Sequence, residues 1–224
     1  MGLNIFIKNM YRVIALGHEA GEIVDQLRRT GIYDDIRFVF CDTESNRLKT
    51  HGRDDDERVL LTGIAQCREA IHEDCELMAV LVTSLEEDDS LKYAMEIMYE
   101  LWSYADYTYC FATTPYGDAV RKKDGSLVGA FNWITDYSLV TVLQDNGRLP
   151  EDFGRSKGMA RLLELVLQHP RKGLSEDRDE SPFGVWATEK QLYMALQAMY
   201  SNYPELSGYY DAEVFSFHKS THKY

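Results

Sequence analysis

The chain has 224 residues, of which 45% are hydrophobic and 27% are charged. This is the composition of an ordinary soluble globular protein, and it excludes disordered, collagen-like and low-complexity classes. The 37 acidic and 24 basic residues give a net charge of −13 at pH 7, which repels a phosphate backbone or an anionic membrane surface. No stretch reaches the ~20 uncharged apolar residues of a membrane helix. We therefore expect a cytoplasmic protein with no nucleic-acid partner and no membrane insertion.

Short apolar runs alternate with helical patterns along the first three quarters of the chain. The runs typical of strands are residues 11–16, 37–41, 58–61, 77–83, 107–112 and 138–143. Apolar residues at helical spacing predict helices between Gly17 and Gly31 and over residues 64–73, 90–105, 127–134 and 159–168. Strands alternating with such helices form a mostly parallel sheet with helices on both faces. The predicted fold class is therefore α/β and Rossmann-like.

The four cysteines, Cys41, Cys67, Cys75 and Cys110, lie in or beside apolar runs. Their positions lack the pair spacing of metal ligands, so we expect reduced cysteines in the core.

The composition changes after a charged, proline-ended linker at residues 175–182. It separates a predicted α/β domain of residues 1–174 from a C-terminal extension, residues 183–224, which holds 10 of the 27 aromatic residues. Residues 188–202 predict an amphipathic helix, so the extension is expected to be helical. Its aromatic residues either pack on the chain's own sheet or form a subunit or partner interface. The interface candidates are Trp186, Tyr193, Tyr200 and Tyr203.

Several segments, in order, resemble the nucleotide-binding half of the FtsZ/tubulin family. Val13–Gly17 is similar to that family's first strand and glycine loop, and Phe38–Leu48 to its second strand and the loop after it. Thr113–Tyr116 resembles its Thr-Arg-Pro-Phe motif, and Val140–Leu149 resembles a strand that ends in Pro-Asn-Asp-Arg-Leu. The resemblance implies a guanine-nucleotide site with magnesium at the carboxyl ends of the strands. The residues at the matching positions are Gly17, Gly21, Asp42, Thr43, Thr113, Asp145, Asn146 and Arg148.

The sequence departs from the family where the chemistry lies. The family's phosphate loop is a glycine-rich stretch that presents backbone N–H groups at a helix N-terminus. Here the corresponding residues, 84–90, contain no glycine and four carboxylates, Glu86, Glu87, Asp88 and Asp89. The family's catalytic Asn-x-Asp-x-x-Asp loop has no counterpart after residues 159–168, and its second domain has no room in the last ~50 residues. The sequence thus argues against GTP hydrolysis by the family's mechanism.

Each candidate site keeps an alternative interpretation. The acidic run is a solvated first helical turn, a magnesium or calcium site, or a surface for a basic partner. Gly17 and Gly21 either form a tight turn or approach a nucleotide, and Asp42 and Thr43 either bind a ligand hydroxyl or act as turn residues. His18 is a loop histidine or a base near a reacting group.

Two functional hypotheses follow. The first is a binding or assembly module of FtsZ/tubulin-like fold that has lost GTP hydrolysis and acts through a protein partner or self-association, without a cofactor. The alternative is a switch or enzyme that binds GTP or another nucleotide, with a metal held by residues 86–89. The tail histidines, His218 and His222, are a plain terminus or a metal-binding pair.

Overall fold

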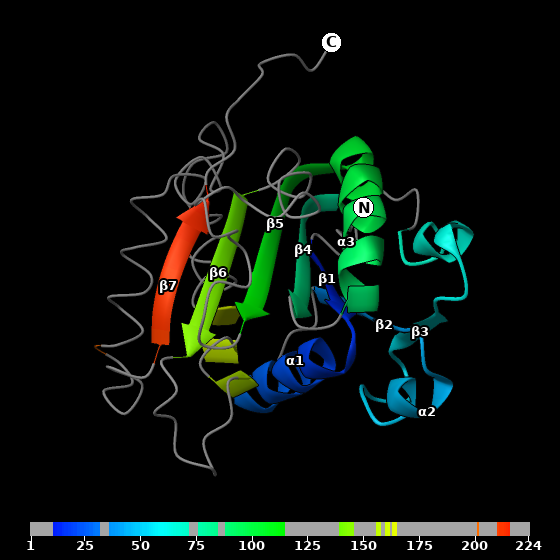
Figure 1. Ribbon diagram of the computed structural model, residues 1–224. Coiled ribbons are helices and arrows are strands. Elements are labelled where there is room, and N and C mark those ends of the chain that lie inside the picture. Colours follow the sequence, from blue (N-terminus) through cyan, green and yellow to red (C-terminus); the bar gives the residue numbers. More distant parts are fainter. Residues whose placement is uncertain are drawn as a thin grey trace, which may run out of the picture.

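The computed structural model describes residues 11–31, 36–71, 76–84, 88–114, 139–145, 156–157, 160–161, 163–164, 201 and 210–215. Their strands form one sheet in the order β3-β2-β1-β4-β5-β6-β7. In chain order they are β1 (Tyr11–Leu16), β2 (Ile36–Asp42), β3 (Glu57–Leu60), β4 (Glu76–Ser84), β5 (Ala105–Thr114), β6 (Leu139–Asp145) and β7 (Tyr210–Phe215). β1 to β6 run parallel, and β7 runs antiparallel to β6 (Figure 1). The predicted mostly parallel sheet is confirmed.

The helices agree with the sequence in part. α1 (His18–Thr30) and α3 (Asp88–Tyr104) lie where helices were predicted, and the short α2 (Ser45–Leu48) was not predicted. The α-helix expected over 64–73 is wrong for residues 64–71, the part of it that the structure describes. Of these, only Ile64–Cys67 are helical, and they form the 3₁₀ helix η1. The N–H groups of Arg68, Glu69 and Ile71 bond to carbonyls three residues back rather than four, which favours tight turns over an α-helix.

Some predicted elements lie partly or wholly outside the described residues. The helix predicted over 127–134 lies outside them, whereas residues 160, 161, 163 and 164 of the predicted helix 159–168 are helical. Of residues 188–202 only Ser201 is described, and it is helical. The helical expectation for residues 183–224 is incomplete, since β7 is a strand of that extension and joins the sheet of the preceding domain.

Helices cover the two faces of the sheet, and this explains the apolar runs of the strands. One buried cluster takes Ile14 and Leu16 from β1 together with Ala94, Ile97 and Met98 of α3. The alternate residues of β1 face the other way, where α1 packs with Ile23, Val24 and Leu27 fully buried. Right-handed crossovers require these opposite faces, because the chain moves from β1 toward β2 through α1 but from β4 toward β5 through α3.

The strand order reverses direction between β1 and β4. In open α/β sheets this switch point, at the carboxyl ends of the strands, is where ligands bind. Among the described residues no helix is long and apolar enough to cross a membrane.

Candidate functional site

Four residues form a row across the carboxyl ends of β2, β1, β4 and β5. Leu16 pairs with Cys41 on one side and Thr83 on the other, and Ser84 pairs with Thr113. The next residues, Asp42, Gly17, Ser84 and Thr113, therefore lie side by side. We call these four residues the strand-end rim. The fold thus brings together three residues that the sequence assigned to a ligand site: Gly17, Asp42 and Thr113.

Gly17 links β1 to α1 in a conformation that favours glycine. Its φ of 89° lies in the left-handed region, and it is the N-cap of α1 with no side-chain cap. Its N–H donates to the carbonyl of Cys41 at 2.8 Å, and its carbonyl accepts from Gly21 at 3.0 Å. The tight-turn interpretation of Gly17 therefore accounts for its backbone conformation and for its N–H group.

Asp42 combines a turn role with an open hydrogen-bonding position. Its Oδ1 accepts a hydrogen bond from the N–H of Glu44 at 2.8 Å, an Asx turn at the end of β2. Its Oδ2 is buried with no hydrogen-bond partner among the described residues. Thr43, next in the chain, is half-buried. Asp42 is thus a turn residue whose second carboxylate oxygen accepts no hydrogen bond from the described residues.

Two threonine hydroxyls at the strand ends also lack hydrogen-bond partners. The Oγ1 atoms of Thr83 and Thr113 are buried and have no hydrogen-bond partner in the described part of the chain. Strand alternation places Thr113 and Asp42 on the sheet face that α1 covers, and Thr83 on the face that α3 covers. An unsatisfied buried polar group costs about 1–3 kcal/mol, and within the described part of the chain the side chains of Asp42, Thr83 and Thr113 bring such groups together at one end of the sheet.

Other predicted site residues are placed only in part. Asp145 ends β6, and Asp88 and Asp89 begin α3, but nothing is described of their side chains. The remaining predicted residues lie outside the described ranges: Asn146, Arg148, Glu86, Glu87, Trp186, Tyr193, Tyr200 and Tyr203.

A polar chain that the sequence did not predict lies along α1. Asp25 Oδ2 is 2.9 Å from His51 Nδ1, and His51 Nε2 is 2.7 Å from His18 Nδ1. Asp25 Oδ1 also accepts from the N–H of Gly52 at 3.1 Å. We call Asp25, His51 and His18 the histidine chain. It fastens the loop after α2 to α1 and reaches the beginning of α1 beside the strand-end rim.

The histidine chain explains a glycine that the sequence analysis assigned to a turn or a nucleotide contact. A Cβ added to Gly21 would lie 2.5 Å from Cδ2 of His51, so the imidazole ring occupies the space above this helical position. The ring also stacks on Phe40, with an angle of 9° between the planes. Gly21 is therefore required by the close approach of His51.

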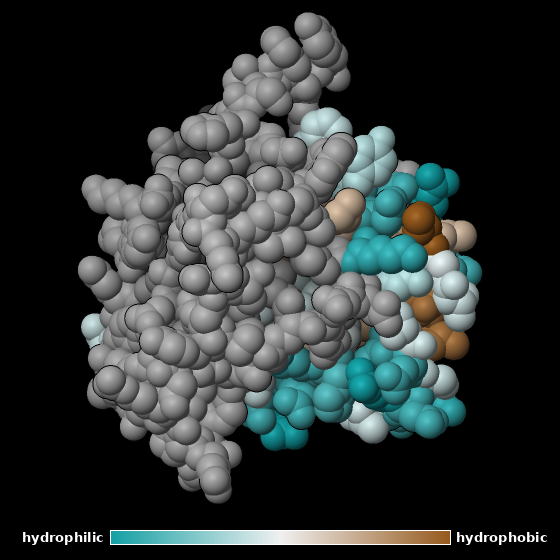
Figure 2. Space-filling view, viewed as in Figure 1, coloured by the Kyte–Doolittle hydropathy of each residue, from teal (hydrophilic) through white to brown (hydrophobic). Residues whose placement is uncertain are grey.

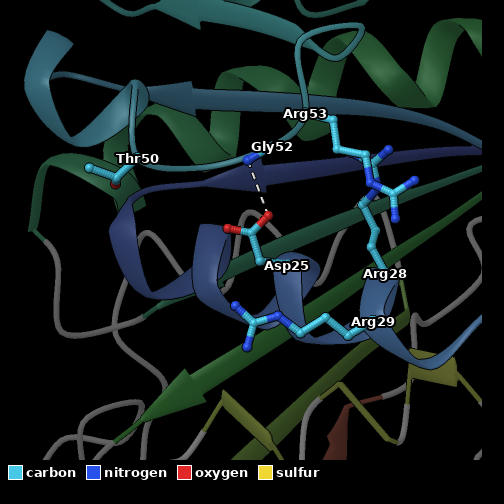
Figure 3. A pocket seen from close by; sticks show the side chains of 6 residues that line it. All are labelled: Asp25, Arg28, Arg29, Thr50, Gly52 and Arg53. Carbon is cyan, nitrogen blue, oxygen red and sulfur yellow. Dashed lines mark hydrogen bonds between the residues drawn. The ribbon is translucent and has the colours of Figure 1, made fainter.

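Three arginines line a pocket of about 260 Å³ farther along α1 (Figure 3). Arg28 lies over the Phe38 ring at 4.6 Å and forms an ion pair with Asp56. Burial, and then the positive charge of Arg53, lower the pKa of Arg28. No ion pair of Arg29 or Arg53 with a carboxylate occurs in the described part of the chain. Hydrophilic side chains cover this part of the surface, over α1 and α2 (Figure 2).

A second cavity, of about 440 Å³, lies beside the first and includes both histidines. Its lining includes His18, Glu22, Arg29, His51 and Ser156. The sequence contains one indication of this cavity. Residues 18, 22, 25 and 29 recur at helical spacing and therefore share one face of α1. The sequence contains no indication of His51, which is 33 residues from His18 and contacts it only through the tertiary fold.

Comparison with known proteins identifies the fold. No family model and no curated protein matches the sequence. Among solved structures, CetZ from Methanosaeta thermophila strain DSM 6194 superposes with a TM-score of 0.62 at 12% identity, over 80% of this chain and 58% of that one. TubZ of Clostridium botulinum phage c-st gives 0.50 at 15% identity, over 84% and 65%. CetZ2 from Haloferax volcanii, described as a GTPγS-bound protofilament, gives 0.51 at 14% identity, over 70% and 57%.

CetZ and TubZ are proteins of the FtsZ/tubulin family, so the resemblance seen in the sequence is confirmed for the fold. The chain spans about three fifths of the length of these structures. At this level of identity the likeness establishes the fold alone, because one fold supports many functions.

Proposed function

We propose that this chain is a binding or assembly module of FtsZ/tubulin-like fold that does not hydrolyse GTP. The main observation is the connection between β4 and α3. α3 begins at Asp88 and Asp89, and Glu86 and Glu87 precede them in the sequence, without a glycine between β4 and α3. In the fold's nucleotide-binding relatives, a glycine-rich loop holds the phosphates at this place.

Electrostatics supports this proposal. A carboxylate about 6 Å from a phosphate charge, at an effective dielectric constant of about 20, costs roughly 2–3 kcal/mol. Several such pairs exceed what a few backbone N–H groups supply. The N–H of Gly17, which leads into α1, is already bonded to Cys41.

For a chain of this fold that does not hydrolyse GTP, the fold suggests a role in assembly. The structure of CetZ2 described as a protofilament has this fold. We propose that this chain associates with itself or with a protein partner of the same fold. Trp186, Tyr193, Tyr200 and Tyr203 are the proposed contact residues, and sedimentation of the wild-type chain beside a variant with all four changed to alanine tests them.

A second candidate, a nucleotide-binding switch, is favoured by the open acceptor of Asp42. Its buried Oδ2 and the hydroxyl of Thr113 suit a ligand that offers hydroxyl groups, such as a ribose. Binding of a phosphorylated ligand would then require a metal at residues 86–89 to offset the carboxylates. Gly17, Thr43, Asp145, Asn146 and Arg148 complete this proposed site.

Thermal melting with GTP, GDP or ATP, with and without magnesium, separates the two candidates. A ligand present at 100 times its Kd stabilises the folded state by about 2.7 kcal/mol. In a domain of this size that raises the Tm by about 5–11 °C, because each kcal/mol shifts it by about 2–4 °C. The assembly module predicts an unchanged Tm at millimolar nucleotide. A magnesium-dependent rise that disappears in Asp42→Ala would instead establish the switch.

A further inference from the structure

His18 and Glu22 place two metal-binding atoms together on α1. They are four residues apart on the helix, and His18 Nε2 lies 3.7 Å from Glu22 Oε1. Both side chains are about half exposed, at 45% and 52%, and both line the cavity of about 440 Å³. The separation is too long for a strong hydrogen bond, but it suits two ligands of one ion. Two donors about 2.0–2.2 Å from a tetrahedral zinc lie about 3.3–3.6 Å apart, so a small movement of the side chains brings both atoms onto one ion.

The histidine chain determines which ring nitrogen of a neutral His18 carries the hydrogen. Asp25 accepts from Nδ1–H of His51, so a neutral His51 presents the lone pair of Nε2. The 2.7 Å contact then requires His18 to donate from Nδ1. A neutral His18 consequently has its lone pair on Nε2, the nitrogen that faces Glu22 and the cavity.

We propose that His18 and Glu22 bind a zinc-class divalent ion through Nε2 and Oε1. His51 and Asp25 act as positioning residues, since metal-binding histidines almost always donate their second ring N–H to a fixed acceptor. Among the described residues, no third histidine, cysteine or carboxylate completes the group. With respect to this part of the chain, the remaining coordination positions are open to water or to a molecule in the cavity. This ion is distinct from any magnesium at residues 86–89, which would be held by oxygen atoms alone.

The test is calorimetric titration of the full chain with Zn²⁺. The tail pair His218 and His222 has the same four-residue spacing, so the titrations are made in the double variant His218→Ala/His222→Ala. We expect saturable binding in this background, weakened at least tenfold by His18→Ala. Glu22→Gln is expected to weaken binding as well, because a carboxamide is a poorer zinc ligand than a carboxylate.

The role of His51 is tested separately. His51→Phe keeps a planar ring against Gly21 and Phe40 but removes the acceptor for His18. Changing such a supporting residue weakens metal binding by about 10–100-fold, and the Tm of the metal-free variant shows whether the fold is kept. The proposal is overturned if the tail double variant binds no Zn²⁺, or if His18→Ala leaves the Kd unchanged.

Discussion

The strand-end rim adjoins the side of α1 that carries the histidine chain, where the His51 ring lies over Gly21. We call this second region the flank. The two regions differ in how their polar groups are hydrogen-bonded. At the rim, Asp42 Oδ2 and Thr113 Oγ1 are buried without hydrogen-bond partners among the described residues. On the flank, both oxygens of Asp25 accept hydrogen bonds and both ring nitrogens of His51 are engaged. The polar groups of the flank are thus satisfied by one another, as in a structural contact. Those of the rim have no such partners among the described residues, as in a ligand-binding site.

The two regions also differ in what places them in the structure. The rim lies where the fold places ligands, at the switch point of the sheet. The flank depends on contacts between the side chains of His51 and Asp25 and on the absence of a side chain at Gly21. Substitutions on the flank should therefore reduce stability, whereas removing the unpartnered hydroxyl of Thr113 at the rim should affect stability little or raise it.

Asp25→Ala is expected to have the largest effect, a loss of about 3 kcal/mol in the free energy of unfolding. It removes the acceptor of two hydrogen bonds and leaves the buried His51 without its partner. Urea denaturation measures the change. Glu22→Ala, on the same helix and about half exposed, is the control and should change stability by less than about 0.5 kcal/mol. Equal losses in the two variants would contradict the structural role of the histidine chain.

Gly21→Ala should cost about 1–2 kcal/mol although alanine is the better helix former. The gain of about 1 kcal/mol in helix propensity is outweighed by the clash with the His51 ring, 2.5 Å from the new Cβ. Gly63→Ala is the control, because its Cβ would meet only the flexible end of Gln66 at 3.4 Å. If Gly21→Ala proved more stable than wild type, the ring could not occupy the position described.

The sequence predicted the rim better than the flank for a physical reason. Buried parallel strands appear as apolar runs, and the residue after each run falls at the carboxyl end, so Gly17, Asp42 and Thr113 could be found without a structure. The contact between His18 and His51 arises from tertiary packing and has no local signature. β7 is a different case, because Asp211 and Glu213 alternate with apolar residues at the period of a strand. This alternation predicts a strand, but it lies in the extension that was predicted to be helical.

The environment directly beneath the rim can be examined through Cys41, the residue before Asp42. Cys41, Cys67 and Cys110 are free and buried, as predicted, and Cys75 lies outside the described residues. Burial is the main cause that raises the pKa of Cys41 above its ordinary value of 9.0. Because the folded pKa is the higher one, the neutral thiol contributes stability below about pH 9, and this contribution is lost as the pH rises.

The wild-type chain should therefore lose about 1.4 kcal/mol more per pH unit above pH 9 than Cys41→Ala does. Urea denaturation of both proteins at pH 8, 9 and 10 measures the two slopes. Cys41→Ala lowers stability at every pH, so the difference between slopes is the informative quantity. Parallel slopes would mean that the strand ends beneath the rim are accessible to water.

Thr113→Val should have the smallest effect, and its sign decides what the rim is. If the hydroxyl has no partner in the whole chain, replacing it by a methyl group removes an unsatisfied polar group and raises stability by up to about 1 kcal/mol. Thr50→Val is the matched control, because Thr50 Oγ1 donates to the carbonyl of Arg47 at 2.7 Å and its loss should cost about 0.5–1 kcal/mol. A similar loss for Thr113→Val would show that a residue outside the described ranges already satisfies the hydroxyl. The rim would then be closed by the chain itself, and the contrast with the flank would disappear.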